Sequence, residues 1–150
     1  MKRLIFFCLA LFLLSPLSAF GGGLENFLAS VNIQARADLP GFSAKISTQF
    51  GVPVPEVHAI INSVQDPADA FMIFQLGQMS REQPERVMAV YTEKKKQGWG
   101  AIARELGIKP GSAEFHALKN GNLSFTGQPA VHGGIQDKGR GKGRGKGHQK

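Results

Sequence analysis

The segment at residues 67–79 most constrains how this chain can fold, because it is apolar around most of its helical circumference. Asp66 at the N-cap position and Pro67 in the first turn predict that a helix begins here. A helix that is apolar on nearly every side must be surrounded by other elements. We therefore expect it at the centre of the domain, with these side chains in the core: Ala70, Phe71, Met72, Ile73, Phe74, Leu76 and Met79.

Shorter amphipathic segments on both sides of this helix would surround it. Each has apolar residues at helical spacing and is bounded by a proline or glycine break, such as Pro40, Gly51, Pro84 or Gly107. Residues 31–37 fit a helix but also alternate in polarity as a strand would, and we favour the helix because no partner strand is apparent. The pattern predicts an all-α fold, a small bundle of about five to seven short helices.

The amino terminus has the pattern of a secretory signal peptide. Lys2 and Arg3 precede an apolar run at residues 4–14, which is too short to cross a hydrocarbon core of roughly 30 Å. We assign residues 1–21 to this leader and expect no transmembrane span in the mature chain. The only cysteine, Cys8, lies in the leader, and exported domains without disulfides are common in bacterial envelopes. The sequence therefore predicts an exported protein, periplasmic or extracellular.

The carboxyl-terminal segment differs from the rest in charge. Residues 22–136 hold ten Lys/Arg and ten Asp/Glu, whereas residues 137–150 hold six bases and one acid, a net charge of +5. Glycine alternates with cations there, and such a sequence buries too little apolar surface to offset its chain entropy. We therefore divide the mature chain into a helical domain at residues 22–121 and a disordered basic tail at residues 122–150.

A flexible polycation of this kind can contact phosphate or carboxylate groups without fixed geometry. Outside the cytoplasm its partners would be anionic lipid, lipopolysaccharide or acidic polysaccharide, and nucleic acid is a further polyanion of the same class. The alternative is a tail that only keeps the domain in solution. The candidate polyanion contacts are Lys138, Arg140, Lys142, Arg144, Lys146 and Lys150.

Residues 102–118 resemble a helix-turn-helix, the hairpin with which many proteins bind DNA. Ala103 would permit close contact between the helices, and Gly107 would make the turn. However, the turn at residues 109–112 is about two residues longer than in the usual motif, and DNA is scarce where an exported protein works. We therefore interpret the segment as a plain helical hairpin and expect no sequence-specific DNA binding.

Three further patterns have structural interpretations. The Gly-Trp-Gly sequence around Trp99 matches letters of a dinucleotide fingerprint, but no hydrophobic strand precedes it, so we interpret it as a helix junction where glycines relieve crowding. Residues 94–96 are three lysines at a predicted helix end, where cations are favourable and solvated. Asp66 and Asp69 suit the first turn of a helix for the same electrostatic reason.

No metal, cofactor or catalytic site is apparent. His58, His116, His132 and His148 do not pair with one another at ligand spacing, and in a loose tail the last two would bind transition metals only weakly. Ser112 is not part of a nucleophile elbow, and the mature chain has no cysteine. The sequence therefore predicts a protein that is not an enzyme and holds no cofactor.

Residues 98–121, GWGAIARELGIKPGSAEFHALKNG, carry a family resemblance together with FGVP at residues 50–53 and DAF at residues 69–71. The chain resembles uncharacterised exported bacterial proteins that have a leader, a small helical domain and a tail rich in glycine and lysine. The resemblance covers residues 24–121 and the type of tail. It implies this architecture and a bacterial envelope setting, but no catalytic residues.

These observations lead to one expected function and two alternatives. We expect an exported, non-catalytic binding or structural protein of the bacterial cell envelope. The first alternative is a polyanion binder that acts through the basic tail, and the second is an unrecognised hydrolase. The sequence indicates neither a protein partner nor an oligomeric state.

Overall fold

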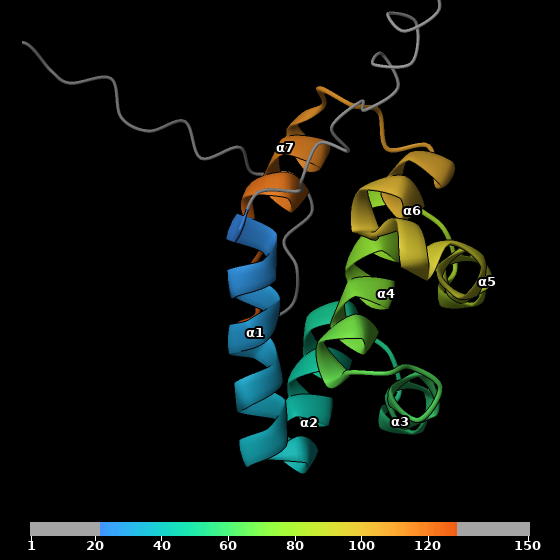
Figure 1. Cartoon of the computed structure of the whole chain (residues 1–150). Coiled ribbons are helices and arrows are strands. Elements are labelled where there is room, and N and C mark those ends of the chain that lie inside the picture. The colour runs from blue at the N-terminus through green and yellow to red at the C-terminus, as the bar shows by residue number, and fades with distance from the viewer. Residues whose placement is uncertain (1–21, 129–150) are drawn as a thin grey trace, which may run out of the picture.

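Residues 22–128, which the computed structural model describes, form seven α-helices and one 3₁₀ helix with no strand among them (Figure 1). The all-α prediction is confirmed for this part of the chain. The predicted leader lies outside the described residues, and so does the chain beyond Gln128. The elements are α1 (Gly22–Ala37), α2 (Leu39–Phe50), α3 (Val54–Ile61), α4 (Pro67–Ser80), α5 (Pro84–Lys94), η1 (Lys95–Gln97), α6 (Trp99–Glu105) and α7 (Ala113–Asn120).

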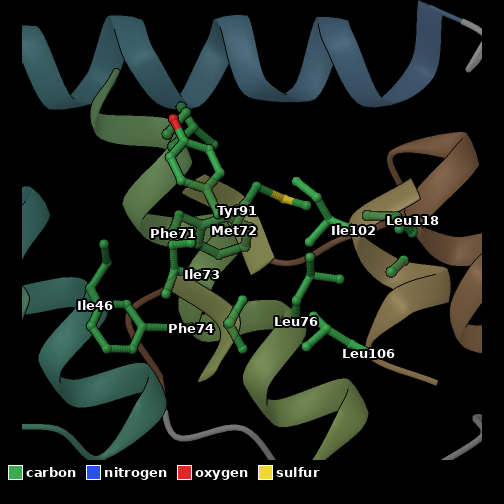
Figure 2. Close-up of a cluster of buried hydrophobic side chains, with 14 of the residues drawn as sticks. Ile46, Phe71, Met72, Ile73, Phe74, Leu76, Tyr91, Ile102, Leu106 and Leu118 are labelled. Atoms are coloured by element: carbon green, nitrogen blue, oxygen red, sulfur yellow. The ribbon is translucent and has the colours of Figure 1, made fainter. Parts of the chain in front are cut away.

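The helix α4 is central, as its apolar circumference predicts. Residues 70–77 are all buried, and α4 packs most extensively against α1 and α5 while also contacting α2 and α3. Figure 2 shows its side chains meeting Ile46 of α2, Ile102 of α6 and Leu118 of α7 in one core. Burying one such side chain contributes about 1.5–3 kcal/mol. Met79, which we expected in the core, is only partly buried against it.

Residues 31–37 are helical, which decides between the two interpretations of their sequence. The helix α1 runs unbroken to Ala37, with Val31 and Ala35 buried, whereas Ile33 is 71% exposed. A strand would place all three side chains on one face, because its side chains alternate with a period of two. The helical rotation therefore separates Ile33 from the core.

The predicted helix ends follow from local signals. Gly51 ends α2 in the left-handed region, with a φ of 68°, and its N–H donates to the carbonyl oxygen of Ser47. Gly121 ends α7 in the same way, with a φ of 67°. At the start of α7 the Ser112 hydroxyl accepts a hydrogen bond of 3.2 Å from the N–H of Phe115 and so caps the helix.

Two glycines allow the end of α7 to touch the start of α1. A Cβ atom on Gly121 would collide with the carbonyl oxygen of Gly23, and one on Gly23 would collide with that of Asn120. These backbones approach so closely only because neither glycine has a side chain. The contact brings the two ends of the helical region together (Figure 1).

Residues 122–128 pack against the helices, although we had assigned them to the tail. The ring of Phe125 lies edge-on to that of Phe71, with 5.6 Å between the centroids. The buried Gln49 side chain makes hydrogen bonds with the backbone of residues 124–127. The packed chain therefore extends beyond residue 121. A single aromatic residue in a polar stretch has no periodicity that would have predicted this contact.

Candidate functional site

An open cleft of about 470 Å³ lies where the start of α4 faces the end of α5, η1 and the start of α6. Its volume falls within the range of about 300–1,000 Å³ that is typical of small-molecule sites. We call it the aromatic cleft, because a tyrosine and a tryptophan form one of its walls. Its lining residues are Gln65, Asp69, Tyr91, Lys95, Lys96, Trp99 and Ile102.

Tyr91 and Trp99 are stacked, with ring centroids 5.4 Å apart and planes inclined by 25°. Gly98, between η1 and α6, has a φ of 85° and so turns the chain in a way that favours glycine. A Cβ atom there would meet nothing within 4 Å, so this glycine serves backbone conformation and does not relieve crowding as we had expected. Trp99 is only partly buried, and it therefore anchors the junction while lining the cleft.

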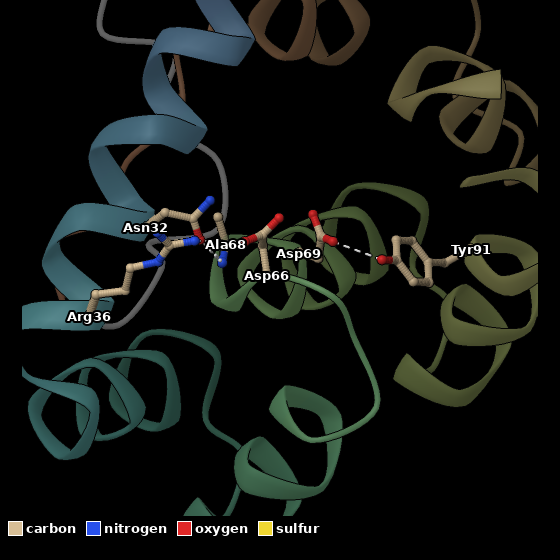
Figure 3. Close-up of polar contacts among 6 residues, drawn as sticks. All are labelled: Asn32, Arg36, Asp66, Ala68, Asp69 and Tyr91. Atoms are coloured by element: carbon tan, nitrogen blue, oxygen red, sulfur yellow. Dashed lines mark hydrogen bonds and ion pairs between the residues drawn. The ribbon is translucent and has the colours of Figure 1, made fainter. Parts of the chain in front are cut away.

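Asp69 and Tyr91 are joined by a hydrogen bond between α4 and α5 (Figure 3). The Tyr91 hydroxyl donates to Oδ2 of Asp69 at 2.7 Å. Burial raises the pKa of the Asp69 carboxyl, and the hydrogen bond from Tyr91 opposes that effect only in part. Burial, reinforced by the same hydrogen bond, raises the pKa of Tyr91 to about 12, so the phenol stays protonated and remains the donor at neutral pH. Asp69 therefore has a hydrogen-bond partner in Tyr91, in addition to its favourable position in the first turn of α4.

The three lysines at residues 94–96 divide into two kinds. Lys94 Nζ lies 3.5 Å from carboxylate oxygens of both Glu105 and Glu93, and these charges raise the pKa of Lys94. Lys95 and Lys96 are exposed, as predicted, but both line the cleft, and neither forms an ion pair within residues 22–128. Lys94 therefore links α5 to the end of α6, and Lys95 and Lys96 are available to a ligand.

The start of α4, which positions Asp69, is held by α1 (Figure 3). Oδ1 of Asn32 accepts a hydrogen bond of 2.8 Å from the backbone N–H of Ala68, and Arg36 pairs with Asp66 at 3.1 Å. Asp66 does occupy the N-cap position, but its side chain makes no capping hydrogen bond. The predicted N-cap position is therefore confirmed, but the Asp66 side chain pairs with Arg36, and Asn32 supplies the acceptor for the first turn of α4.

The predicted hairpin at residues 102–118 consists of α6 and α7. Gly107 makes the turn with a φ of 83°, and Ala103 and Leu118 are fully buried. Because α7 packs against α1 as well as α6, it belongs to the bundle as an ordinary packed helix. A second cleft of about 330 Å³ lies beside the turn, and its polar lining includes Ser80, Arg81, Lys109, Ser112 and Glu114.

The remaining candidates from the sequence form no site within the described chain. His58 and His116 are exposed on α3 and α7. Between residues 22 and 128, no group of His, Cys, Asp or Glu could hold a metal ion. His132 and His148 lie outside the described residues. The same is true of the tail cations Lys138, Arg140, Lys142, Arg144, Lys146 and Lys150.

Known proteins provide no template for the aromatic cleft. No family model, curated protein or solved structure matches the chain. Among the helices of residues 22–128, none has the length and apolarity needed to cross a membrane. Function must therefore be inferred from the chemistry of the cleft.

Part of the cleft could have been found from the sequence. Tyr91 and Trp99 are the only tyrosine and the only tryptophan of the chain, and they flank the lysines at residues 94–96. Such aromatics often place an apolar body in the core and a polar end at the surface. The contribution of Asp69 was not visible, because it lies 22 residues from Tyr91 and reaches it only when α4 and α5 pack together.

Proposed function

We propose that this chain is a non-catalytic binding protein of the bacterial cell envelope and that the aromatic cleft binds an anionic ligand. The observation that carries the proposal is the position of Lys95 and Lys96, which line the cleft beside a stacked pair of aromatic rings without forming an ion pair in the described chain. Cations next to an aromatic wall suit a ligand that has both an anionic group and an apolar face.

The distribution of charge supports an anionic ligand at this place. Residues 22–136 carry equal numbers of basic and acidic residues, so the domain as a whole does not attract anions. The lining of the cleft, in contrast, holds two lysines and a single carboxylate, that of Asp69. The attraction is therefore local, and a bound anion would gain contacts that the rest of the surface does not offer.

The amino-terminal pattern supports the proposed location. Two cations followed by an apolar run at residues 4–14 are typical of a leader that directs export. An exported bacterial protein meets anionic polymers and lipids in the envelope. The location and the charge of the cleft therefore favour the same kind of ligand.

Trp99 allows the proposal to be tested directly, because the only tryptophan of the chain lines the cleft. We would titrate the purified protein with inorganic phosphate, citrate and a short oligomer of galacturonic acid, and follow tryptophan fluorescence. At least one of these anions should change the emission in a saturable manner. If none does, the aromatic cleft is not an anion-binding site.

Matched variants distinguish anion binding in the aromatic cleft from a general effect of positive charge on the protein surface. The K95Q/K96Q variant removes two lysines of the cleft, whereas R86Q/K119Q removes two exposed cations on α5 and α7 that do not line it. We expect K95Q/K96Q to bind the anion about tenfold more weakly, which corresponds to roughly 1.4 kcal/mol. The control should bind as the wild type does. Equal weakening in both variants would mean that the cleft has no special role.

A further inference from the structure

The geometry points to an acidic polysaccharide as the ligand of the aromatic cleft, bound through a segment of hydroxyl-rich sugar rings that carry carboxylate groups. This inference rests on the proposed function, since it names the class of anion. Three features of the cleft lead to it. They are the aromatic wall, the acceptor group that faces the ligand together with the lysines, and the openness of the site.

The aromatic wall suits a sugar ring. Tyr91 is 5% exposed and stacks on Trp99, which is partly exposed and lines the cleft. The face of an aromatic ring is electron-rich and attracts the weakly positive C–H groups on the apolar face of a pyranose ring. Because Tyr91 fixes the orientation of Trp99, the indole is prepared for such a contact before a ligand arrives.

Asp69 excludes anions that can only accept hydrogen bonds. An ionised carboxylate is itself only an acceptor, and Oδ2 of Asp69 already receives the hydroxyl of Tyr91. A ligand group beside Asp69 must therefore donate. Sulfate and a phosphodiester backbone offer only acceptors and a like charge there, whereas sugar hydroxyls donate. The amide of Gln65, which also lines the cleft, can both donate to and accept from such hydroxyls.

The lysines require the same ligand to carry a negative charge close to its hydroxyls. Lys95 and Asp69 line the same cleft, so a cation and an acceptor face one ligand. Nζ of Lys95 also lies 5.9 Å from the centroid of the Tyr91 ring. A ligand that satisfies Lys95, Asp69 and the aromatic wall together combines a carboxylate, hydroxyl donors and an apolar face in one small unit, as a uronic acid does.

The shape of the cleft favours a polymer over a free sugar acid. The cleft is partly open to solvent, whereas sites for small molecules usually bury most of the ligand surface. A polysaccharide can lay one segment across such a site while its neighbouring units continue into solvent. Weak contacts with each unit then suffice, because adjacent units raise the local concentration.

The test compares three ligands by tryptophan fluorescence: a trimer of galacturonic acid, the uncharged galactose trimer of the same linkage, and inorganic sulfate, which can only accept hydrogen bonds. We expect a saturable change with the acidic trimer, binding of the neutral trimer that is about tenfold weaker, and no change with sulfate. If sulfate binds in a manner that depends on Lys95 and Lys96 while the acidic trimer does not bind, this inference is overturned and the proposed function stands. If no ligand binds, both are overturned.

A second comparison tests the selectivity assigned to Asp69. The Asp69→Asn variant keeps the side-chain shape and an oxygen that accepts from Tyr91, but it removes the charge and adds donors. Its affinity for the acidic trimer should fall severalfold, while binding of sulfate should appear. If Asp69 were only structural, the variant would not acquire sulfate binding, and that result would contradict the role given to it.

The Gln65→Ala variant tests the contact assigned to Gln65 without altering the core, because Gln65 is exposed. We expect affinity for the acidic trimer to fall by a factor of about three to ten, since one polar contact is lost. An unchanged affinity would remove Gln65 from the site.

The same fluorescence measurement tests the class of ligand. If a DNA oligonucleotide or vesicles of anionic lipid changed Trp99 fluorescence and the acidic trimer did not, the proposed class of ligand would be wrong.

Discussion

Tyr91 shows how a single residue connects the core with the candidate site. Its ring is almost fully buried in the core cluster and stacks on Trp99, while its hydroxyl holds Asp69. Apolar burial thus fixes the aromatic wall, and one hydrogen bond fixes the acceptor beside it. A change at Tyr91 would affect both stability and the geometry of the cleft.

The ionisation of Tyr91 is the first prediction. Because Tyr91 is the only tyrosine, phenolate absorbance reports on it alone, and the folded protein should titrate with a pKa of about 12 in place of the ordinary 10.0. The folded pKa is raised, so the stability that Tyr91 contributes is fully present below pH 10.0 and is lost as the pH rises through about 12. The same protein in concentrated urea is the control and should titrate near 10.0. A folded protein that also titrates near 10.0 would contradict the burial and hydrogen bond described here.

At the scale of elements, the junction of α1 with α4 determines where Asp69 is placed. The Asn32→Ala variant should lower the free energy of unfolding by about 1 kcal/mol, because it removes the cap of α4 and leaves the buried N–H of Ala68 without an acceptor. The Asp66→Ala variant should cost only a few tenths of a kcal/mol, because its ion pair with Arg36 is exposed. Urea unfolding measures both. The reverse order would mean that Asp66 is the effective cap.

The elements differ in how far the sequence could predict them. Gly51, Ser112 and Gly121 act within their own turn of helix, so their sequence context was sufficient. The composition of α4 alone placed it at the centre. By contrast, the cap from Asn32 and the packing of Phe125 join residues far apart in the sequence, and their energetic basis exists only after the helices have packed.

The aromatic cleft was less predictable than the helices for the same reason. The lysines and Trp99 were noticed in the sequence, but only as a helix end and a junction. The cleft exists because α4, α5 and α6 bring Asp69, Tyr91 and Trp99 together, and periodicity does not encode how neighbouring helices are rotated against one another. The apolar periodicity of a helix identifies its buried face, but it says little about a site that forms where the exposed edges of several helices meet.

In the molecule as a whole, two groups of cations have different expected binding properties. Lys95 and Lys96 are fixed beside an aromatic wall, whereas the cations of residues 137–150 follow one another between glycines. Fixed cations select ligands by geometry, and a run of cations in a glycine-rich sequence binds polyanions by counterion release, with little selectivity and strong salt dependence. The two modes predict different responses to the same truncation.

A protein truncated after Gln136 should lose most of its salt-dependent binding to vesicles of anionic lipid, while the response of Trp99 to the acidic trimer should be unchanged. The slope of log affinity against log salt concentration should become less steep, since fewer counterions are released. A full-length variant with Gln at the six tail cations is the control for length and should behave as the truncated protein does. If truncation instead abolished the Trp99 response, the tail and the cleft would form one binding site, and the polyanion activity would belong to both. If salt-dependent binding persisted in both variants, the domain would carry that activity, and the basic tail would be only a solubilising segment.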